Sequence, residues 1–326
     1  MTATTTGVVP VAKRAGVGWG DLAWLTWRQH RWAIAGLVAG AAAVVALALV
    51  LVWRVDATGD MQGLFGRWRF ISLGSVVMLA PIATGLAIAV FWAAPVLARE
   101  YEQRTHLVVW SQDITPTRWL TGKVVLLGVP AVAVAVGVGL AARALVDSIN
   151  ATSDRPVFEL FAMPAFEAVP LVQTAYAAFG FALGLAFSAV TRRTVLSMGL
   201  TLGAFIGVRV VVAGLWRPNF QTPLFKVEPY DAYRQQWDGP GDGSWVVNSG
   251  FSDAAGNEVD YPACSNTVDQ AAYAKCMNDN NVLFFTQYHP ADRLVPFQLF
   301  ESAIFLVLAA GLLALAFARV RRARRI

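Results

Sequence analysis

The sequence predicts an all-α polytopic membrane protein with six spans and a small extramembrane domain between the fifth and the sixth. Hydrophobic residues make up 56% of the 326 residues and charged residues 14%, whereas soluble domains average about 45–50% and about 25%. The mean hydropathy is +0.52, and the apolar residues lie in long runs with basic residues mostly on one side of them. This composition excludes an ordinary soluble enzyme.

Six apolar runs are long enough to cross a bilayer, whose core of about 30 Å requires roughly 20 residues of helix. They cover residues 33–53, 71–98, 124–146, 166–190, 195–216 and 297–318. The first run is longer than the core of a signal peptide, which has about 7–15 apolar residues, and it is therefore predicted to be a retained span.

The distribution of Lys and Arg predicts that both termini are cytoplasmic. With this orientation the inner segments carry 15 of the 26 basic residues and four of the 21 acidic residues, Asp21, Glu100, Glu102 and Asp113. One loop departs from the pattern, because Arg54, Arg67 and Arg69 lie on the outer side. The other segments follow the positive-inside pattern, so we expect both termini to be cytoplasmic despite this loop.

Residues 1–32 form a cytoplasmic N-terminal segment with four tryptophans, at positions 19, 24, 27 and 32. From residue 18 the pattern is imperfectly amphipathic, which is typical of an elbow helix lying in the membrane interface. An aromatic belt in front of the first span is an equally good interpretation.

Residues 217–296 are predicted to form an extracellular domain, rich in Gly, Pro, Asn and Asp. It contains Cys264 and Cys276, the only cysteines of the chain. Because thiols oxidise outside the cell, we expect them to form a disulfide, worth about 3 kcal/mol in the chain-entropy model. Two free thiols are the alternative.

The familiar motifs of catalysis are missing from the sequence. There is no phosphate loop, since Thr121-Gly122-Lys123 is followed by Val124 and lacks the upstream glycine. A nucleophile elbow and a His-Glu-x-x-His motif are also absent, and the three histidines lie on both sides of the membrane. We therefore expect no catalytic site, no metal site and no cofactor in this chain.

Charged residues fall within several predicted spans, where a charge costs roughly 2.5–3.5 kcal/mol or more at mid-bilayer. Arg209 lies in the fifth span, and Glu167 and Glu301 lie near the outer ends of the fourth and sixth. A pair between Arg209 and either glutamate would lower the cost and close the outer end of a pathway. Snorkelling to the headgroups is the alternative.

Two Gly-x-x-x-Gly pairs, Gly36/Gly40 and Gly180/Gly184, are candidates for close helix contacts. Such pairs are common by chance in a chain this rich in Gly and Ala, so the signal is weak.

The segment after the second span, residues 98–123, carries an unusual series of charges and polar steps. Its features stand at Arg99-Glu100, Arg104-Thr105, Leu107-Val108, Ser111-Gln112, Arg118-Trp119-Leu120 and Lys123. Here the chain resembles the permease subunits of ABC-2 type transporters. The stretch from Tyr288 to Gln298 is similar to actinobacterial members of that family. An outer segment of about 80 residues, larger than the short hairpin of many relatives, is the main departure.

This resemblance implies a type V exporter-like fold in the bacterial plasma membrane and a coupling loop that docks on a separate ATPase subunit. Arg99, Glu100, Glu102, Arg104 and Thr105 are expected at or near that contact. ATP and Mg would be bound by the partner, and two permeases, identical or paralogous, would assemble with two ATPases. The expected substrate is amphipathic (an antibiotic, a peptide or a lipid-like molecule) and is moved outward, with membrane lipid as a further partner and no nucleic acid.

Two other classes of function remain open. A membrane enzyme could use the outer domain as its active face, where Asp231, Asp238 and Asp242 occur. A sensor or immunity protein could bind a ligand there without transport. A neighbouring ATPase gene would favour the permease, and a neighbouring kinase gene would favour sensing.

Overall fold

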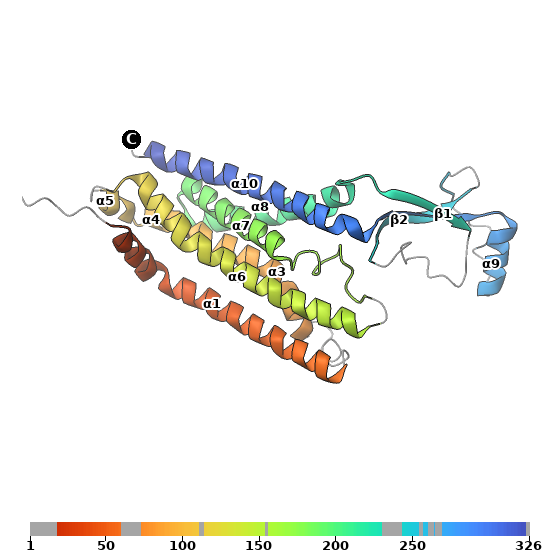
Figure 1. Cartoon of the computed structure of the whole chain (residues 1–326). Helices are drawn as coiled ribbons and strands as arrows, with labels where there is room; N and C mark the ends of the chain where they lie inside the picture. The colour runs from red at the N-terminus through yellow and green to blue at the C-terminus, as the bar shows by residue number, and fades with distance from the viewer. Residues whose placement is uncertain are drawn as a thin grey trace, which may run out of the picture.

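A computed structural model describes residues 18–59, 73–110, 114–153, 156–229, 243–253, 257–259, 264 and 269–323. Within these ranges, six helices are long and apolar enough to cross a membrane, and Figure 1 shows them as one elongated bundle. A small sheet lies at one end of the bundle, and both ends of the described chain lie at the other. The fold class predicted from the sequence is therefore confirmed.

The first span lies in α1 (Trp19–Thr58). The second combines α3 (Leu73–Ala87), η1 (Ile88–Ala93) and α4 (Ala94–Glu102). The third and fourth are α6 (Pro116–Thr152) and α7 (Pro170–Thr191). The fifth combines α8 (Thr194–Val210), η2 (Val211–Trp216) and η3 (Arg217–Asn219), and the sixth combines η5 (Ala291–Arg293) and α10 (Leu294–Ala323). A short helix, α5 (Thr105–Trp110), joins the second span to the third.

The first helix is continuous through the expected elbow and the first span. Its 40 residues make a rod of about 60 Å, twice the bilayer core, so its first turns extend beyond the apolar layer. Trp19, Trp24, Trp27 and Trp32 are all exposed. Figure 1 places these turns beside α4 and α5.

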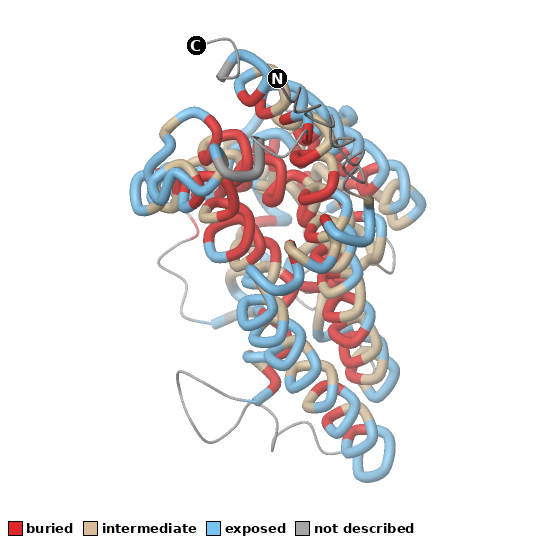
Figure 2. Tube along the Cα trace, turned by 90° about the vertical axis from the view of Figure 1, so that its left-hand side faces the viewer, coloured by how far each residue is buried: buried red, intermediate tan, exposed pale blue. Residues whose placement is uncertain are grey.

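The centre of the bundle is α7, which packs against α10, α6, α4, α8 and η1. Figure 2 shows the buried residues gathered inside the ring of helices. Gly180 and Gly184 allow α7 to approach the second span, because a Cβ on Gly184 would lie 2.5 Å from the Ala89 carbonyl oxygen. The weak motif at these two glycines thus marks a true contact, whereas a Cβ on Gly36 or Gly40 would meet no atom of the described residues within 4 Å.

The second span changes from α- to π-helix at η1, and Pro95 follows in the first turn of α4. Ser188 of α7 supplies a side-chain acceptor at this irregularity, since its Oγ accepts from the backbone N–H groups of Leu97 (3.1 Å) and Ala98 (2.6 Å). A polar side chain from the central helix thereby supports the backbone where the regular helical pattern is disturbed.

The segment between the fifth and sixth spans contains a three-stranded antiparallel sheet of β1 (Leu224–Pro229), β2 (Trp245–Ser252) and β3 (Leu283–His289), in the order β1-β3-β2. A shift in register between Val246 and Asn248 marks a bulge in β2. The helix α9 (Gln270–Asp279) precedes β3, and its Cys276 forms a disulfide with Cys264. Cys264, Met277 and Val282 make a small separate core beneath it.

Several residues named from the sequence lie outside the described ranges. They are Arg67, Arg69, Ser111, Gln112, Asp113, Asp231, Asp238 and Asp242.

Candidate functional site

The intramembrane charges form one buried cluster at the sheet end of the bundle. Arg209 pairs with Glu167, and the Arg217 guanidinium pairs with Glu301 through Nε (2.7 Å) and Nη2 (2.9 Å). Tyr176 of α7 donates its hydroxyl hydrogen to Glu301. Arg209 lies over the Tyr176 ring, with 3.8 Å from guanidinium carbon to ring centroid. The cluster therefore contains two positive and two negative charges, paired with one another.

The π-helix η2 explains how Arg209 and Arg217 reach the same cluster. Eight residues of α-helix make roughly 2.2 turns, which would place the two side chains on different faces. A π-bulge accommodates one extra residue, so the separation resembles seven α-helical residues, or just under two turns. Both guanidiniums then face Glu167, with Arg217 Nη2 3.8 Å from its Oε1.

This arrangement answers one question that the sequence left open and adds two residues to the site. Arg209 pairs with Glu167 rather than with Glu301. Arg217 and Tyr176 were missed, because Arg217 reads as an ordinary basic residue at a span boundary and Tyr176 as an ordinary aromatic within a span. Arg217, Tyr176 and Arg209 are all buried, whereas an arginine that snorkels to the headgroups keeps its guanidinium exposed.

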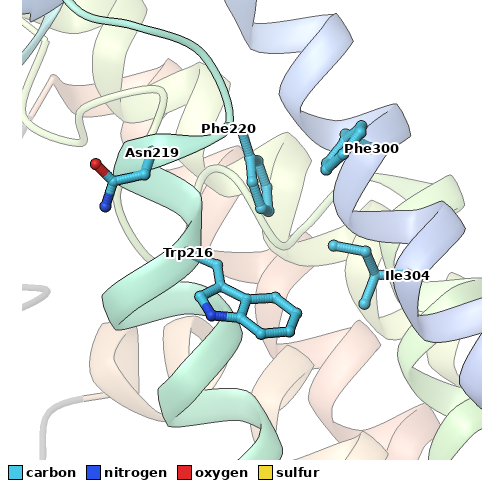
Figure 3. Close-up of a pocket in the computed structure, with 5 residues that line it drawn as sticks. All are labelled: Trp216, Asn219, Phe220, Phe300 and Ile304. Carbon is cyan, nitrogen blue, oxygen red and sulfur yellow. The ribbon is translucent and has the colours of Figure 1, made fainter.

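An aromatic cavity of about 440 Å³ is lined by Trp216, Asn219, Phe220, Phe300 and Ile304, which include the sequence neighbours of Arg217 and Glu301. Figure 3 shows Trp216 and Phe220 directed toward Phe300 and Ile304 of α10, while Asn219 points away from them. Trp216 is 52% exposed and Phe300 56%. The cavity therefore opens on the exterior of the helix bundle, and its aromatic lining suits a hydrophobic group.

At the opposite end, the segment after the second span turns back on itself between α4 and α5. Arg104 takes a left-handed conformation there, with φ of 55°. Arg99, Glu102, Arg104 and Thr105 are exposed, whereas Glu100 is buried. Four of the five residues expected at a partner contact are thus on the surface.

Glu100 pairs with Lys123 of α6, with 2.6 Å between Oε1 and Nζ, and the two side chains are 9% and 2% exposed. Lys123 also lies over the Trp119 ring. Neither residue faces the surface, so Glu100 ties the second span to the third. The sequence signal for this pair is weak, because Lys123 directly precedes the apolar run of the third span and is not inside it; once such a charge is buried, it requires a partner.

Glu102 joins the same segment to the fifth span. Its carboxylate accepts from the backbone N–H (2.9 Å) and the hydroxyl (2.6 Å) of Thr194, the first residue of α8. A carboxylate at this position satisfies a helix N–H that has no partner within the helix and interacts favourably with the helix dipole.

Residues 56–217 match the model of a family described as ABC-2 membrane transporter related. Over these residues the chain belongs to that family. The matched residues run from the end of α1 to Arg217, so the ABC-2-related part includes the segment after the second span and three of the four charges in the buried cluster. No curated protein and no solved structure matches the chain.

Members of the ABC-2 family are typically permeases without a catalytic site of their own. Within the described ranges of this ABC-2-related chain, no group of three or more His, Cys, Asp or Glu side chains is placed to hold a metal ion. The buried cluster is balanced in charge, with two guanidiniums and two carboxylates.

Proposed function

We propose that this chain is the permease subunit of an ATP-driven exporter, with both termini cytoplasmic and the sheet domain outside the cell. The family match supports this proposal most strongly. In addition, the exposed turn between α4 and α5 lies at the end of the bundle where both ends of the described chain lie. Arg99, Glu102, Arg104 and Thr105 of this turn are the proposed contact with a separate ATPase subunit, which would bind ATP and Mg.

We further propose that two permeases, identical or paralogous, assemble with two ATPases and move an amphipathic substrate outward. The aromatic cavity between Trp216 and Ile304 is chemically suited to the apolar part of such a substrate. The buried charge cluster is the proposed outer closure of the pathway.

The test is affinity purification of the tagged protein from its native membrane in mild detergent, followed by mass spectrometry and an ATPase assay. A stoichiometric partner with a phosphate loop is expected. Arg104→Glu should remove this partner, whereas Arg104→Asn should weaken it less, because asparagine tolerates the left-handed conformation and only deletes the charge.

Glu100→Lys is unsuitable for this purpose, because it would break a buried pair. Lys275→Glu, at an exposed position of α9 at the sheet end, is the matched control and should leave the partner bound. A protein that purifies without any ATPase in every detergent, or one whose partner survives Arg104→Glu, would contradict the proposal. A ligand of the outer domain would then be sought.

A further inference from the structure

A polar pocket lies between the first turns of α1 and the end of α4. Its volume is about 200 Å³, and it is lined by Gln29, His30, Val96, Arg99, Glu100, Gln103 and Thr105. The residues come from two spans and from the start of α5, so the pocket exists only because the elbow part of α1 packs beside the second span.

Two buried polar atoms at this pocket have no hydrogen-bond partner among the described residues. They are Nε2 of His30 and Oε2 of Glu100. The Glu100 side chain is only 9% exposed, and its other oxygen is held by Lys123. A buried polar atom without a partner is costly, so the pocket is built to receive a group that donates a hydrogen bond to the carboxylate.

The charges around the pocket favour a ligand that also carries an anion. Lys123 balances Glu100, and Arg99 adds one exposed positive charge at the rim. The described side chains that line the pocket or pair into it therefore sum to one positive charge. A ligand with an anionic group for Arg99 and an N–H or O–H donor for Glu100 satisfies both requirements.

The position of the pocket along the bundle identifies where such a ligand would come from. Gln29 and His30 lie just before the apolar run that begins at Ala33, and Arg99 directly follows the run that ends at Ala98. Trp27 and Trp32 are 55% and 79% exposed at the same level, as is typical of side chains in the headgroup region. This is the level of the phospholipid phosphates.

We propose that this pocket binds the headgroup of a phospholipid from the leaflet at this end of the bundle. The phosphate contacts Arg99, and an ammonium or hydroxyl group of the headgroup donates to Oε2 of Glu100. Val96 provides an apolar contact for the start of the acyl chains. Arg99 and Thr105 also belong to the proposed ATPase contact, but lipid binding requires neither an ATPase partner nor transport.

The test uses the full-length protein, purified in detergent and stripped of lipid. Native mass spectrometry then measures the binding of lipids with identical acyl chains and an ethanolamine, glycerol or choline headgroup. The ethanolamine and glycerol lipids should bind about tenfold more tightly than the choline lipid, because choline has no N–H or O–H for Glu100. Arg99→Gln should weaken all three about tenfold.

Arg28→Gln is the matched control, because Arg28 is an exposed arginine of α1 at the same end of the bundle but does not line the pocket. Equal binding of the three lipids would overturn the proposal, as would an Arg99→Gln protein that binds lipid like Arg28→Gln. Glycerophosphoethanolamine, which lacks acyl chains, should compete only weakly. Full competition by it or by inorganic phosphate would show a soluble anion to be the ligand instead.

Discussion

The charged residues at the sheet end of the bundle can be buried there only because each has a partner. Arg209 and Glu167 lie on different segments, and both are buried. In a buried pair, removing one partner leaves the other charge uncompensated, which is more costly than removing both.

Arg209→Met should therefore destabilise the protein by about 3–5 kcal/mol, and the double variant Arg209→Met with Glu167→Leu should be more stable than the single one. Thermal unfolding in detergent measures both. Arg143→Met is the control, because Arg143 forms an exposed pair with Asp147 and should change stability by less than about 1 kcal/mol. A double variant less stable than Arg209→Met would show that the two residues are not partners.

His289, at the end of β3, has both ring nitrogens occupied. Arg293 donates from Nη1 to Nδ1 (3.1 Å), so the ring proton lies on Nε2 and is donated to the Pro218 carbonyl (3.0 Å). Burial, first of all, and the charge of Arg293 lower the pKa of His289 below its ordinary value of 6.5, against the opposing effect of the Pro218 hydrogen bond. A second ring proton would face the guanidinium.

Because the unfolded chain binds this proton more readily, His289 should make stability fall as the pH drops below 6.5. Above that value, its contribution should be constant. Melting temperatures measured from about pH 5 to pH 8, across the range in which histidine titrates, should show a steeper acid loss for the natural protein than for His289→Gln. Parallel curves for the two proteins would exclude His289 as the cause.

At the scale of single residues, the sequence predicted which charges need partners but not which partners they have. Glu167, Glu301 and Arg209 stood out because they interrupt apolar runs. Their pairing depends on η2, whose extra residue turns Arg217 toward the same cluster, and on Tyr176, which has no distinguishing sequence signal. Glu100 was placed with the surface residues because local charge patterning does not show that Lys123, one helix away, would bury it.

At the scale of elements, the length and polarity of the apolar runs were sufficient to predict all six spans. The observed helix boundaries differ from the predicted ones where local sequence preferences act in addition to hydrophobicity. The fourth helix begins at Pro170, not at residue 166, because proline is favoured in the first turn of a helix, and residues before it carry Glu167 into the charge cluster. The sheet was not predicted, since its short strands lie between long irregular segments.

The contact of α7 with the second span gives a prediction at this scale. Gly184→Ala should destabilise the protein by about 1–3 kcal/mol, because the new methyl group would lie 2.6 Å from the Cβ of Ala93 and 2.5 Å from the Ala89 carbonyl oxygen. Gly40→Ala, with no neighbour of the described chain within 4 Å, should not destabilise it. Equal melting temperatures for the two variants would mean that the helices are not in close contact.

At the scale of the whole molecule, one element connects the two candidate sites. The fifth span begins at Thr194, which is hydrogen-bonded to Glu102 beside the proposed ATPase contact, and ends with Arg209 and Arg217 in the charge cluster. Its 26 residues extend about 39 Å. A displacement of the turn between α4 and α5 would therefore reach the charge cluster through a single helix.

Thr194→Val should accordingly separate partner binding from transport. It removes the hydroxyl bond to Glu102 but leaves the exposed turn intact, so the proposed ATPase should still co-purify, while stimulation of its activity by substrate should fall several-fold. Thr84→Val is the control, because the Thr84 hydroxyl donates to the Ala80 carbonyl within α3, away from this junction. Loss of the partner in Thr194→Val would place Thr194 at the contact itself, and unchanged stimulation would exclude the fifth span as the connection.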